Sequence, residues 1–332
     1  MNKLVRVLGG GWYGCHIATT LLLAGHEVEL HESATHLFAG ASGSNPARLH
    51  LGFHYPRSRM TRAACQEQFS EFMASYGDLT AHIPENIYAI AEDDSQVDFS
   101  NYVQTLKGEL ECITVFDPLE WGLKGIEGAL LTGERHIIIS RARSFFEKAL
   151  EGSAKYSVRP EEYREADFDL TVDCTFCALD GKNIDRYEPC ITAVMRGPTE
   201  RALTVMDGPF PSIYPWDEEK GLLSLTSARF TPLARCDTHE EARAVLRDSP
   251  VNVIEDHVEW MRDSLAEFWP ASRDMFEPVD TLLSVRAMPK SAAAARLVDV
   301  VKTGDRTIRI RAGKIISIFH AERLVKETLC SL

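Results

Sequence analysis

The spacing of hydrophobic and polar residues divides the chain into parts of two kinds. Near the N-terminus, an apolar run at 4–8 predicts a buried strand, and apolar residues three and four apart predict a helix that ends at Gly25. A second strand is expected at 28–32. Similar patterns predict helices at 60–75, 99–106, 141–150 and from 312 to about 329, and strands at 87–91, 136–139, 155–158, 169–173 and 307–310.

From Tyr187 the pattern changes to short apolar segments that are separated by Gly, Pro and acidic residues. They predict strands at 191–195, 202–206, 212–214, 222–226 and 281–287, with a helical stretch at 238–269. Residues 108–132 carry no clear pattern. We therefore expect an α/β protein with a Rossmann-like dinucleotide-binding domain, formed by 1–82, 133–182 and 296–332. An inserted substrate domain, with an antiparallel β-sheet plus helix, would be formed by 83–132 and 183–295.

The turn between the first strand and the first helix fits the spacing G-x-G-x-x-G on Gly9, Gly11 and Gly14. Gly9 allows a tight turn, Gly11 lets a pyrophosphate approach the backbone, and Gly14 lets the helix pack closely on the strand. Glu32 closes the second strand, where a carboxylate can accept both hydroxyls of an adenosine ribose and disfavours the 2′-phosphate of NADP. The unit predicts a dinucleotide site; the alternative is a glycine-rich turn in some other α/β protein.

Composition narrows the classes of function. The 332 residues are 45% hydrophobic, and the 36 Lys and Arg against 49 Asp and Glu give a formal net charge of −13, so binding to nucleic acid or anionic lipid is disfavoured. No apolar run reaches the roughly 18 residues of a transmembrane helix. The first strand is expected directly after the N-terminus, so we expect no signal peptide. We expect a cytoplasmic protein without a membrane span.

Two features could bind a metal or carry redox chemistry, and each has a simpler interpretation. Cys174 and Cys177 form the one C-x-x-C among eight cysteines, either as ordinary residues after a strand or as a redox dithiol. His50 and His54 lie four residues apart in a segment without helical pattern, and no third ligand is visible. We expect no bound metal.

Four stretches, in this order, resemble the FAD-dependent D-amino-acid oxidase superfamily, which includes glycine oxidase, sarcosine oxidase, L-2-hydroxyglutarate oxidase and FAD-type glycerol-3-phosphate dehydrogenases. They are the glycine turn with its acid at 9–32, the small polar segment 41–56, the strand end at 168–175, and the segment 312–317. Phe176 departs from the glycine that the family usually places after the threonine. The resemblance implies bound FAD and a flavoprotein oxidoreductase.

The resemblance also implies which residues contact the cofactor. Ser42, Ser44 and Asn45 would lie near the pyrophosphate and the ribityl chain, and the segment from His50 to Gly52 would approach the isoalloxazine. A helix start at Gly313 and Lys314 would stabilise negative charge on the reduced ring. The full expected set is Gly9, Gly11, Trp12, Tyr13, Gly14, Glu32, Ser42, Ser44, Asn45, Arg48, Leu49, His50, Val158, Thr175, Gly313, Lys314 and Ile315.

Four residues are candidates for catalysis. Arg286 ends an apolar strand and could clamp a substrate carboxylate, with Arg296 or an internal salt bridge as alternatives. Tyr214 could line the substrate pocket or be a core residue. His50 and His54 could shape the pocket, bond covalently to the flavin, or act as a base.

The reaction that these features favour is hydride transfer to FAD from a C–H beside the nitrogen of a small amine or amino acid. The substrate would carry a carboxylate, and dioxygen or another acceptor would reoxidise the cofactor. Alternatives are oxidation of a 2-hydroxy acid, or a flavin-binding protein without turnover. A flavin monooxygenase is a further alternative, for which the sequence shows no second nicotinamide motif.

Overall fold

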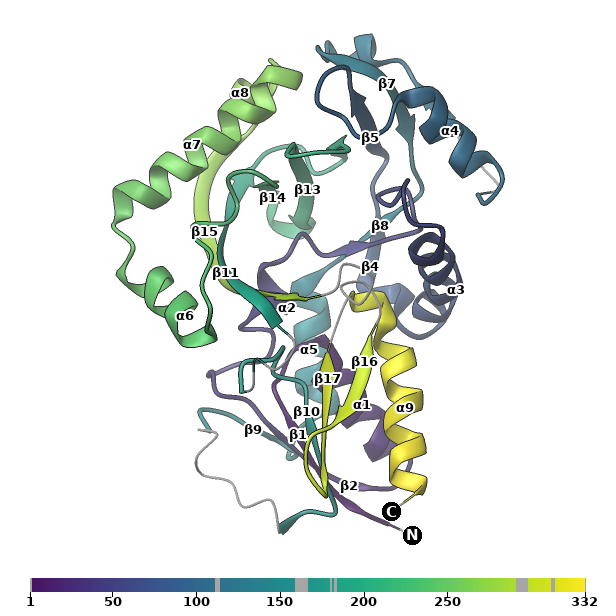
Figure 1. Ribbon diagram of the computed structural model, residues 1–332, viewed down its shortest axis with the longest axis vertical. Coiled ribbons are helices and arrows are strands. Elements are labelled where there is room, and N and C mark those ends of the chain that lie inside the picture. The colour runs from purple at the N-terminus through teal and green to yellow at the C-terminus, as the bar shows by residue number, and fades with distance from the viewer. Residues whose placement is uncertain are drawn as a thin grey trace.

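The fold consists of two large β-sheets with helices packed against them, plus one small sheet (Figure 1). The computed structural model describes residues 2–110, 114–158, 167–179, 181, 184–290, 298–311 and 314–331. The six-stranded sheet lies in the half of the molecule that carries both chain termini, and the eight-stranded sheet lies in the other half. This arrangement is the expected α/β architecture.

The six-stranded sheet is the predicted dinucleotide-binding sheet, with the strand order β16-β17-β10-β1-β2-β9. All neighbouring strands pair in parallel except β16 and β17. Parallel strands with both faces covered need apolar side chains on both sides, which explains the continuous apolar runs in the sequence. The strands are β1 (Leu4–Leu8), β2 (Glu27–His31), β9 (Ala154–Lys155), β10 (Leu170–Asp173), β16 (Asp299–Lys302) and β17 (Thr307–Arg311).

The eight-stranded sheet has the order β15-β11-β14-β13-β12-β5-β7-β6. It is antiparallel, as predicted, except that β5 and β12 pair in parallel. Two of its strands, β11 and β15, have 13 residues each and are longer than the sequence pattern indicated. The strands are β5 (Glu85–Ala91), β6 (Thr114–Phe116), β7 (Ile126–Leu131), β11 (Ile184–Arg196), β12 (Arg201–Met206), β13 (Pro211–Asp217), β14 (Leu222–Ser227) and β15 (Glu277–Pro289).

Both faces of the eight-stranded sheet are packed. Along β5, Ile87 and Ala89 face the core under α7 (Val251–Phe268), whereas Tyr88 and Ile90 face the core under α4 (Phe99–Lys107). This alternation is the period of two that a strand imposes on its side chains. It lets one strand contribute to two separate hydrophobic cores.

A three-stranded sheet joins the two halves, with the order β3-β8-β4. Its strands are β3 (Arg48–Leu49), β8 (Arg135–Ile137) and β4 (Thr80–His82). The segment 39–56 also holds a short helix, α2 (Ala41–Ser44). The remaining helices are α1 (Trp12–Leu23), α3 (Arg59–Tyr76), α5 (Ile139–Ala149), α6 (His239–Asp248), α8 (Ser272–Met275) and α9 (Ile318–Cys330), with 3-10 turns at Gly77–Leu79, Pro118–Trp121, Glu218–Lys220 and Ile315–Ser317.

Three expectations from the sequence need correction. The helical stretch 238–269 is two helices, because Pro250 has no N–H and the extended Ser249 before it separates α6 from α7. The final helix begins at Ile318, so Lys314 precedes a 3-10 turn and does not open the helix. The strand expected at 155–158 is only the pair Ala154–Lys155, beside β2.

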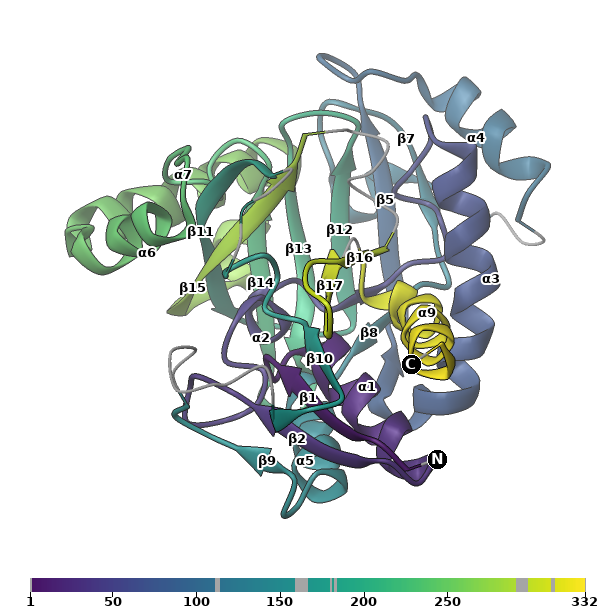
Figure 2. The same ribbon diagram turned by 60° about the horizontal axis from the view of Figure 1, so that its bottom comes forward.

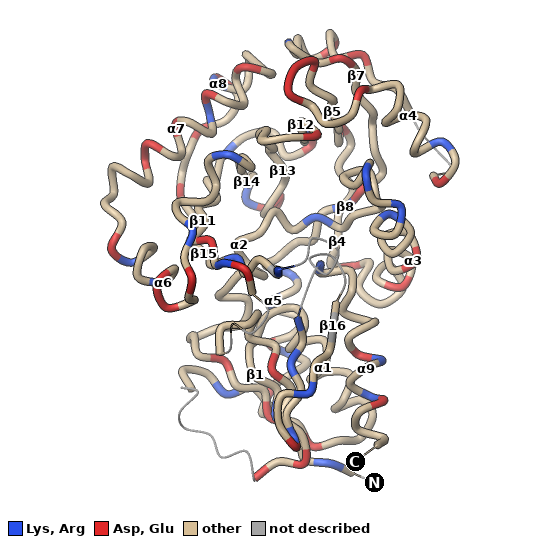
Figure 3. The backbone as a smooth tube through the Cα atoms, in the orientation of Figure 1, with Lys and Arg blue, Asp and Glu red and all other residues tan. Residues whose placement is uncertain are grey.

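Charges of both signs are spread over both halves of the chain, as Figure 3 shows. Within the part of the chain that the structure describes, no helix is long and apolar enough to cross a membrane.

Helices α1 and α9 are tied together by a largely buried polar contact. His16 Nε2 lies 2.9 Å from Glu322 Oε2, and His16 Nδ1 lies 2.7 Å from the Tyr76 hydroxyl of α3. The hydrogen bond with His16 outweighs the cost of burial and lowers the pKa of Glu322 from 4.5 to about 2, and Lys326 adds to the effect. Figure 2 shows α1, α3 and α9 side by side.

We predict that Glu322→Gln lowers the free energy of unfolding by about 1–2 kcal/mol at pH 7, because a hydrogen bond to a charged group is lost. A carboxylate with a lowered pKa stabilises the fold above its unfolded pKa, and this stability is lost as the pH falls toward the folded value. The difference between the two proteins in urea unfolding should therefore shrink below pH 4.5. As a control, Glu71→Gln breaks the exposed ion pair between Glu71 of α3 and Arg323 of α9, the helix that carries Glu322. This variant should lower the free energy of unfolding by less than about 1 kcal/mol.

Candidate functional site

A cavity of about 870 Å³ lies at the carboxyl ends of β1 and β10, where Leu8 and Cys174 line it. This volume is within the roughly 300–1,000 Å³ of small-molecule and cofactor sites. The carboxyl edge of a parallel sheet is where α/β folds bind their ligands. The cavity is therefore the candidate site for the dinucleotide.

The glycine turn lies along one wall of the cavity, with the geometry that the three glycines predict. Gly9 has φ +94, which is strained for other residues, and a Cβ on Gly14 would lie 1.9 Å from the Gly9 carbonyl oxygen. A Cβ on Gly11 would lie 2.8 Å from Ser42 Oγ. The backbone can approach a phosphate here because no side chain intervenes.

Glu32 closes the same wall at the end of β2. Its Oε2 accepts a 2.6 Å hydrogen bond from the Gly10 N–H, and its Oε1 accepts one of 2.8 Å from the Ala34 N–H. Each carboxylate oxygen has two lone pairs, so Glu32 can still accept hydroxyl groups of a ribose. The turn and the carboxylate are thus held to each other before any ligand binds.

The short helix α2 continues the wall toward the second sheet. Ser42 Oγ accepts a 3.0 Å hydrogen bond from the Trp12 N–H at the start of α1. The Gly43 carbonyl oxygen accepts one of 3.0 Å from Trp216 Nε1, which lies on β13 of the large sheet. The segment between the glycine turn and the large sheet is therefore fixed at both of its sides.

Most of the residues expected to bind the cofactor are brought together around this cavity. Those that line it are Gly9, Gly11, Trp12, Tyr13, Glu32, Ser42, Asn45, Val158, Thr175, Lys314 and Ile315. Those that do not are Gly14, Ser44, Arg48, Leu49 and His50, and Gly313 lies outside the described residues. Gly14 acts through packing, Leu49 is completely buried, and Ser44 Oγ donates to the Gly40 carbonyl oxygen. Cofactor contact by each residue stays a prediction.

The sequence did not predict that α6 forms part of the wall of this cavity. The helix α6 contributes His239, Arg243, Leu246 and Arg247 to the lining of the same cavity. These residues lie more than 200 positions from the glycine turn, and no motif marks them. Only the three-dimensional arrangement brings them to the cavity.

Lys314 lies at the inner end of the cavity. Its Nζ is 3.2 Å from the centre of the Tyr55 ring, and its carbonyl oxygen accepts a hydrogen bond from the Tyr13 hydroxyl. Burial holds the pKa of Lys314 well below 10.5, and the positive charge of Arg48 lowers it further.

Arg48 is likewise partly buried. Its guanidinium donates to Thr204 Oγ1, at 2.9 Å, and to Ser212 Oγ, and lies 4.4 Å from the centre of the Tyr214 ring. Its Nε is buried without a hydrogen-bond partner. Among the described residues, neither Arg48 nor Lys314 forms an ion pair with an acid.

His50 lies beside a completely buried carboxylate that the sequence gave no reason to select. His50 Nδ1 is 3.3 Å from Glu134 Oε2, and the side chain of His50 is 15% exposed. Burial lowers the pKa of His50 to about 4; Glu134 opposes this shift and Lys314 adds to it. The imidazole is therefore neutral at neutral pH.

The other two catalytic candidates are placed differently. Tyr214 is completely buried, under Arg48 and hydrogen-bonded to Asn86 Nδ2 at 3.2 Å. Arg286 is paired with an acid, since its Nε and Nη2 contact Glu188 Oε2 at 2.9 and 2.5 Å. This ion pair is the alternative that the sequence left open for Arg286. The other alternative clamp, Arg296, lies outside the described residues.

The His54 ring lies beside the rings of His50 and Tyr88, with distances of 5.6 and 5.9 Å between ring centres. Cys174, which directly follows β10 and is half-buried, lines the cavity, and desolvation raises the pKa of its thiol well above 9.0. The thiol is therefore protonated at neutral pH and is a poor nucleophile.

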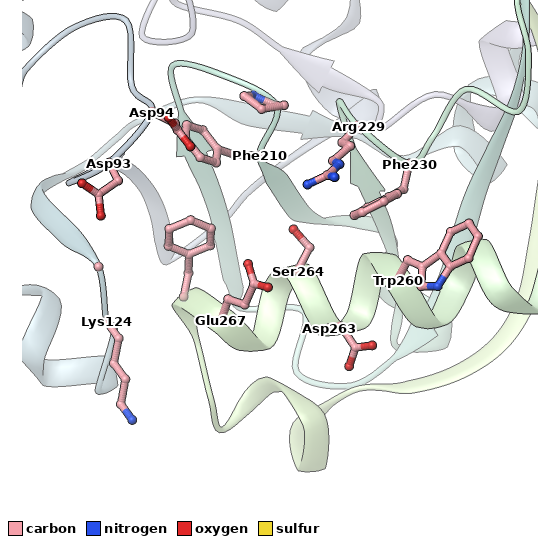
Figure 4. A pocket seen from close by; sticks show the side chains of 13 residues that line it. Asp93, Asp94, Lys124, Phe210, Arg229, Phe230, Trp260, Asp263, Ser264 and Glu267 are labelled. Atoms are coloured by element: carbon pink, nitrogen blue, oxygen red, sulfur yellow. The ribbon is translucent and has the colours of Figure 1, made fainter.

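A second cavity of about 380 Å³ lies under α7 on the large sheet, away from the glycine turn (Figure 4). Aromatic residues such as Phe210 and Trp260 line it, together with acids of α7. Arg229 projects into it and lies 5.2 Å from the Phe230 ring centre. None of the residues expected from the sequence to bind cofactor or substrate lines this cavity.

Comparison with known proteins agrees with this geometry. The chain is 34% identical over 334 residues to FAD-dependent monooxygenase FPY4 of Fusarium mangiferae, covering 96% of this chain and 89% of the relative. It is 30% identical over 358 residues to FAD-dependent monooxygenase kojA of Aspergillus flavus, covering 96% and 83%. No protein-family model matches the chain.

Solved structures share the fold at low sequence identity. Glycine oxidase from Geobacillus kaustophilus superposes with a TM-score of 0.72 at 14% identity, covering 98% of this chain and 94% of that one. NikD, an unusual amino acid oxidase, superposes with a TM-score of 0.69 at 13% identity, covering 96% and 92%. These similarities confirm the expected fold and, with the two relatives, FAD as the cofactor.

We predict that Glu32→Gln weakens FAD binding about 10- to 150-fold, the equivalent of the roughly 1.5–3 kcal/mol of a hydrogen bond to a charged group. The amide keeps the shape of the side chain, but its NH₂ group cannot accept a hydrogen bond from a ribose hydroxyl. The measurement is the dissociation constant of FAD for the apoprotein, followed by quenching of flavin fluorescence. Glu27→Gln, at the exposed start of β2, should leave it unchanged, and equal constants for both variants would contradict a ribose contact at Glu32.

Proposed function

The chain belongs to the family of FAD-dependent oxidoreductases that includes the FAD-dependent monooxygenases FPY4 and kojA, and it has the fold of glycine oxidase; we propose that it oxidises the C–N bond of a small amino acid or other carboxylate-bearing amine. FAD, when bound, would accept the hydride, and dioxygen or another acceptor would then reoxidise it. The residues of the chain bind the carboxylate, orient the C–H bond and remove a proton from the nitrogen.

The observation that carries this proposal is the presence of two partly buried basic side chains, Lys314 and Arg48. A buried charge without a partner is costly, and no described acid forms an ion pair with either residue. A substrate carboxylate would supply the missing negative charge. Arg48 and Lys314, which the sequence indicated only as cofactor contacts, therefore replace Arg286 as the proposed carboxylate anchor.

His50 is the proposed proton acceptor beside this anchor. An amino acid reaches the site as an ammonium, and its nitrogen must lose a proton before its lone pair can assist departure of the hydride. The neutral imidazole of His50 is available for this proton, since burial lowers its pKa to about 4. The products would be the protonated imine, the protonated histidine and the reduced cofactor, and water would then hydrolyse the protonated imine.

The same histidine favours one second candidate, oxidation of a 2-hydroxy acid. This reaction needs a base for the hydroxyl proton as well as an anchor for the carboxylate. His50 would serve as the base, and its ring contacts that of Tyr55, over which Lys314 Nζ lies. The two candidates differ only in the atom that gives up the proton.

The proposal is tested by anaerobic bleaching of the purified flavoprotein. Amino acids, N-methyl amines and 2-hydroxy acids are mixed with it one at a time, and loss of the flavin absorbance is followed. Bleaching by an amino acid supports the proposal, and bleaching by a 2-hydroxy acid alone supports the second candidate. Fast bleaching by NADH or NADPH, with no bleaching by any amine or 2-hydroxy acid, would contradict both candidate functions and indicate a monooxygenase.

The depressed pKa of Lys314 gives a prediction for pH. Binding a carboxylate favours the ammonium form, so binding is coupled to proton uptake by Lys314. The KM should be lowest below the lowered pKa and should rise above it, by at most about tenfold per pH unit. Lys314→Met should raise the KM about 10- to 150-fold at low pH, from the loss of roughly 1.5–3 kcal/mol, and should remove the slope. A slope that persists in the variant would place the titration elsewhere.

A further inference from the structure

Glu134 is a carboxylate in the centre of the molecule whose position the proposed function has not yet explained. It is completely buried. Its Oε1 accepts hydrogen bonds from the backbone N–H groups of Leu51, at 2.8 Å, and Gly52, at 3.2 Å. Its Oε2 accepts one of 2.6 Å from the Tyr88 hydroxyl and faces His50 Nδ1 at 3.3 Å.

These contacts favour the ionised form of Glu134. Burial by itself would raise its pKa, but the nearby His50 and the hydrogen bonds from His50, Tyr88 and Leu51 outweigh burial and lower it. An ionised carboxylate only accepts hydrogen bonds. The nitrogen that faces it, His50 Nδ1, must therefore carry a hydrogen.

A neutral imidazole has one protonated nitrogen and one lone pair. With the hydrogen on Nδ1, the lone pair lies on Nε2, at the opposite edge of the ring. The hydrogen bond to Glu134 thus selects the tautomer in which Nε2 can accept a proton.

We propose that Glu134 is the positioning residue that holds His50 as the tautomer able to take the substrate proton at Nε2. This inference rests on the proposed function. The proton passes from the substrate N–H, or O–H, to Nε2, and the Nδ1 hydrogen stays in place between His50 and Glu134. The positive charge that then forms on the imidazole is balanced by the carboxylate.

Hydrogen bonds and packing fix the positions of Glu134 and of the loop that follows His50. The backbone carbonyl of Glu134 accepts a 3.2 Å hydrogen bond from Asn86 Nδ2 on β5, so the residue is anchored to the large sheet. Gly52 has φ +118, and a Cβ there would lie 3.3 Å from Arg62 of α3. The carboxylate is therefore anchored to the large sheet, and the loop that follows His50 packs against α3.

The other charged and titratable groups around the ring do not provide this hydrogen bond. Lys314 and Arg48 are basic and oppose a positive imidazole, and both lower the pKa of His50. His54 and Tyr55 contact the ring through their own rings, at 5.6 and 5.3 Å between centres. Within the described part of the chain, Glu134 is the acid whose carboxylate lies within hydrogen-bond distance of His50.

The first test is Glu134→Gln in the FAD-loaded protein. The amide oxygen can still accept from Leu51 and Gly52, but the amide NH₂ then faces His50 Nδ1 and donates to it. His50 must move its hydrogen to Nε2, which removes the base. We expect kcat/KM for the substrate found by bleaching to fall about 10²- to 10⁴-fold, the usual contribution of a positioned base, with FAD content unchanged.

Two further variants separate this effect from a general disturbance of the site. Glu134→Asp keeps the carboxylate and should recover part of the loss, whereas Tyr88→Phe removes one donor to Glu134 without changing the His50 tautomer. Tyr88→Phe should therefore lose less than tenfold. Equal losses in Glu134→Gln and Tyr88→Phe would overturn the proposal, because burial rather than tautomer selection would explain both.

The second test needs neither a substrate nor a stable Glu134 variant. The ¹⁵N chemical shifts of the histidine rings in the wild-type flavoprotein distinguish the two tautomers, and His50→Gln identifies the signals of His50. We expect hydrogen on Nδ1 and a lone pair on Nε2 at pH 7. The opposite tautomer would overturn the role of Glu134 directly. If the expected tautomer is found but no amine or hydroxy acid bleaches the flavin, the proposed function fails and not the hydrogen-bond geometry.

Discussion

The close approach of Gly14 to Gly9 is the constraint on which the cofactor half of the molecule depends. A Cβ on Gly14 would lie 1.9 Å from the Gly9 carbonyl oxygen, so only glycine lets α1 start directly on the end of β1. This start directs the first N–H groups of α1 toward the cavity and brings Trp12 into an aromatic core with Phe38 and Phe146, at 5.3 Å between ring centres. In the same turn, the Gly10 N–H donates a hydrogen bond to Glu32. Phosphate approach, helix packing and the placement of the acid are thus consequences of one short contact.

The inner site follows from a second constraint, the cost of burying charge. Glu134 is stable as an ion because three fixed donors and His50 surround it. Arg48 is surrounded by hydroxyl groups and the face of Tyr214, and Lys314 by the face of Tyr55. Hydroxyl groups and rings stabilise a cation less than a carboxylate does. The site is therefore complete on its acidic side and deficient in negative charge on its basic side, which is the asymmetry that a carboxylate substrate would remove.

The sequence predicted those parts of the fold and site that depend on neighbouring residues. The glycine spacing, the acid that closes the second strand and the period of the first helix all act over about 30 residues, and each has its expected place. Partners distant in the chain could not be predicted. Nothing near Arg286 indicates that Glu188 lies opposite it across β11 and β15, and nothing near Glu134 indicates that it receives the N–H groups of Leu51 and Gly52. The parallel pairing of β5 with β12 was missed for the same reason, since strand composition does not record the partner's direction.

The segment 40–52 links the two constraints. At one end, Ser42 accepts the N–H of Trp12, and at the other, Leu51 and Gly52 donate to Glu134. Between them, Gly43 is bonded to Trp216, and Arg48 to Thr204, in the large sheet. A displacement of this segment would therefore disturb the phosphate turn, the basic pair and the His50–Glu134 contact together. Because one stretch of backbone carries all three, the geometry that holds the cofactor and the geometry that receives the substrate are set by the same set of hydrogen bonds.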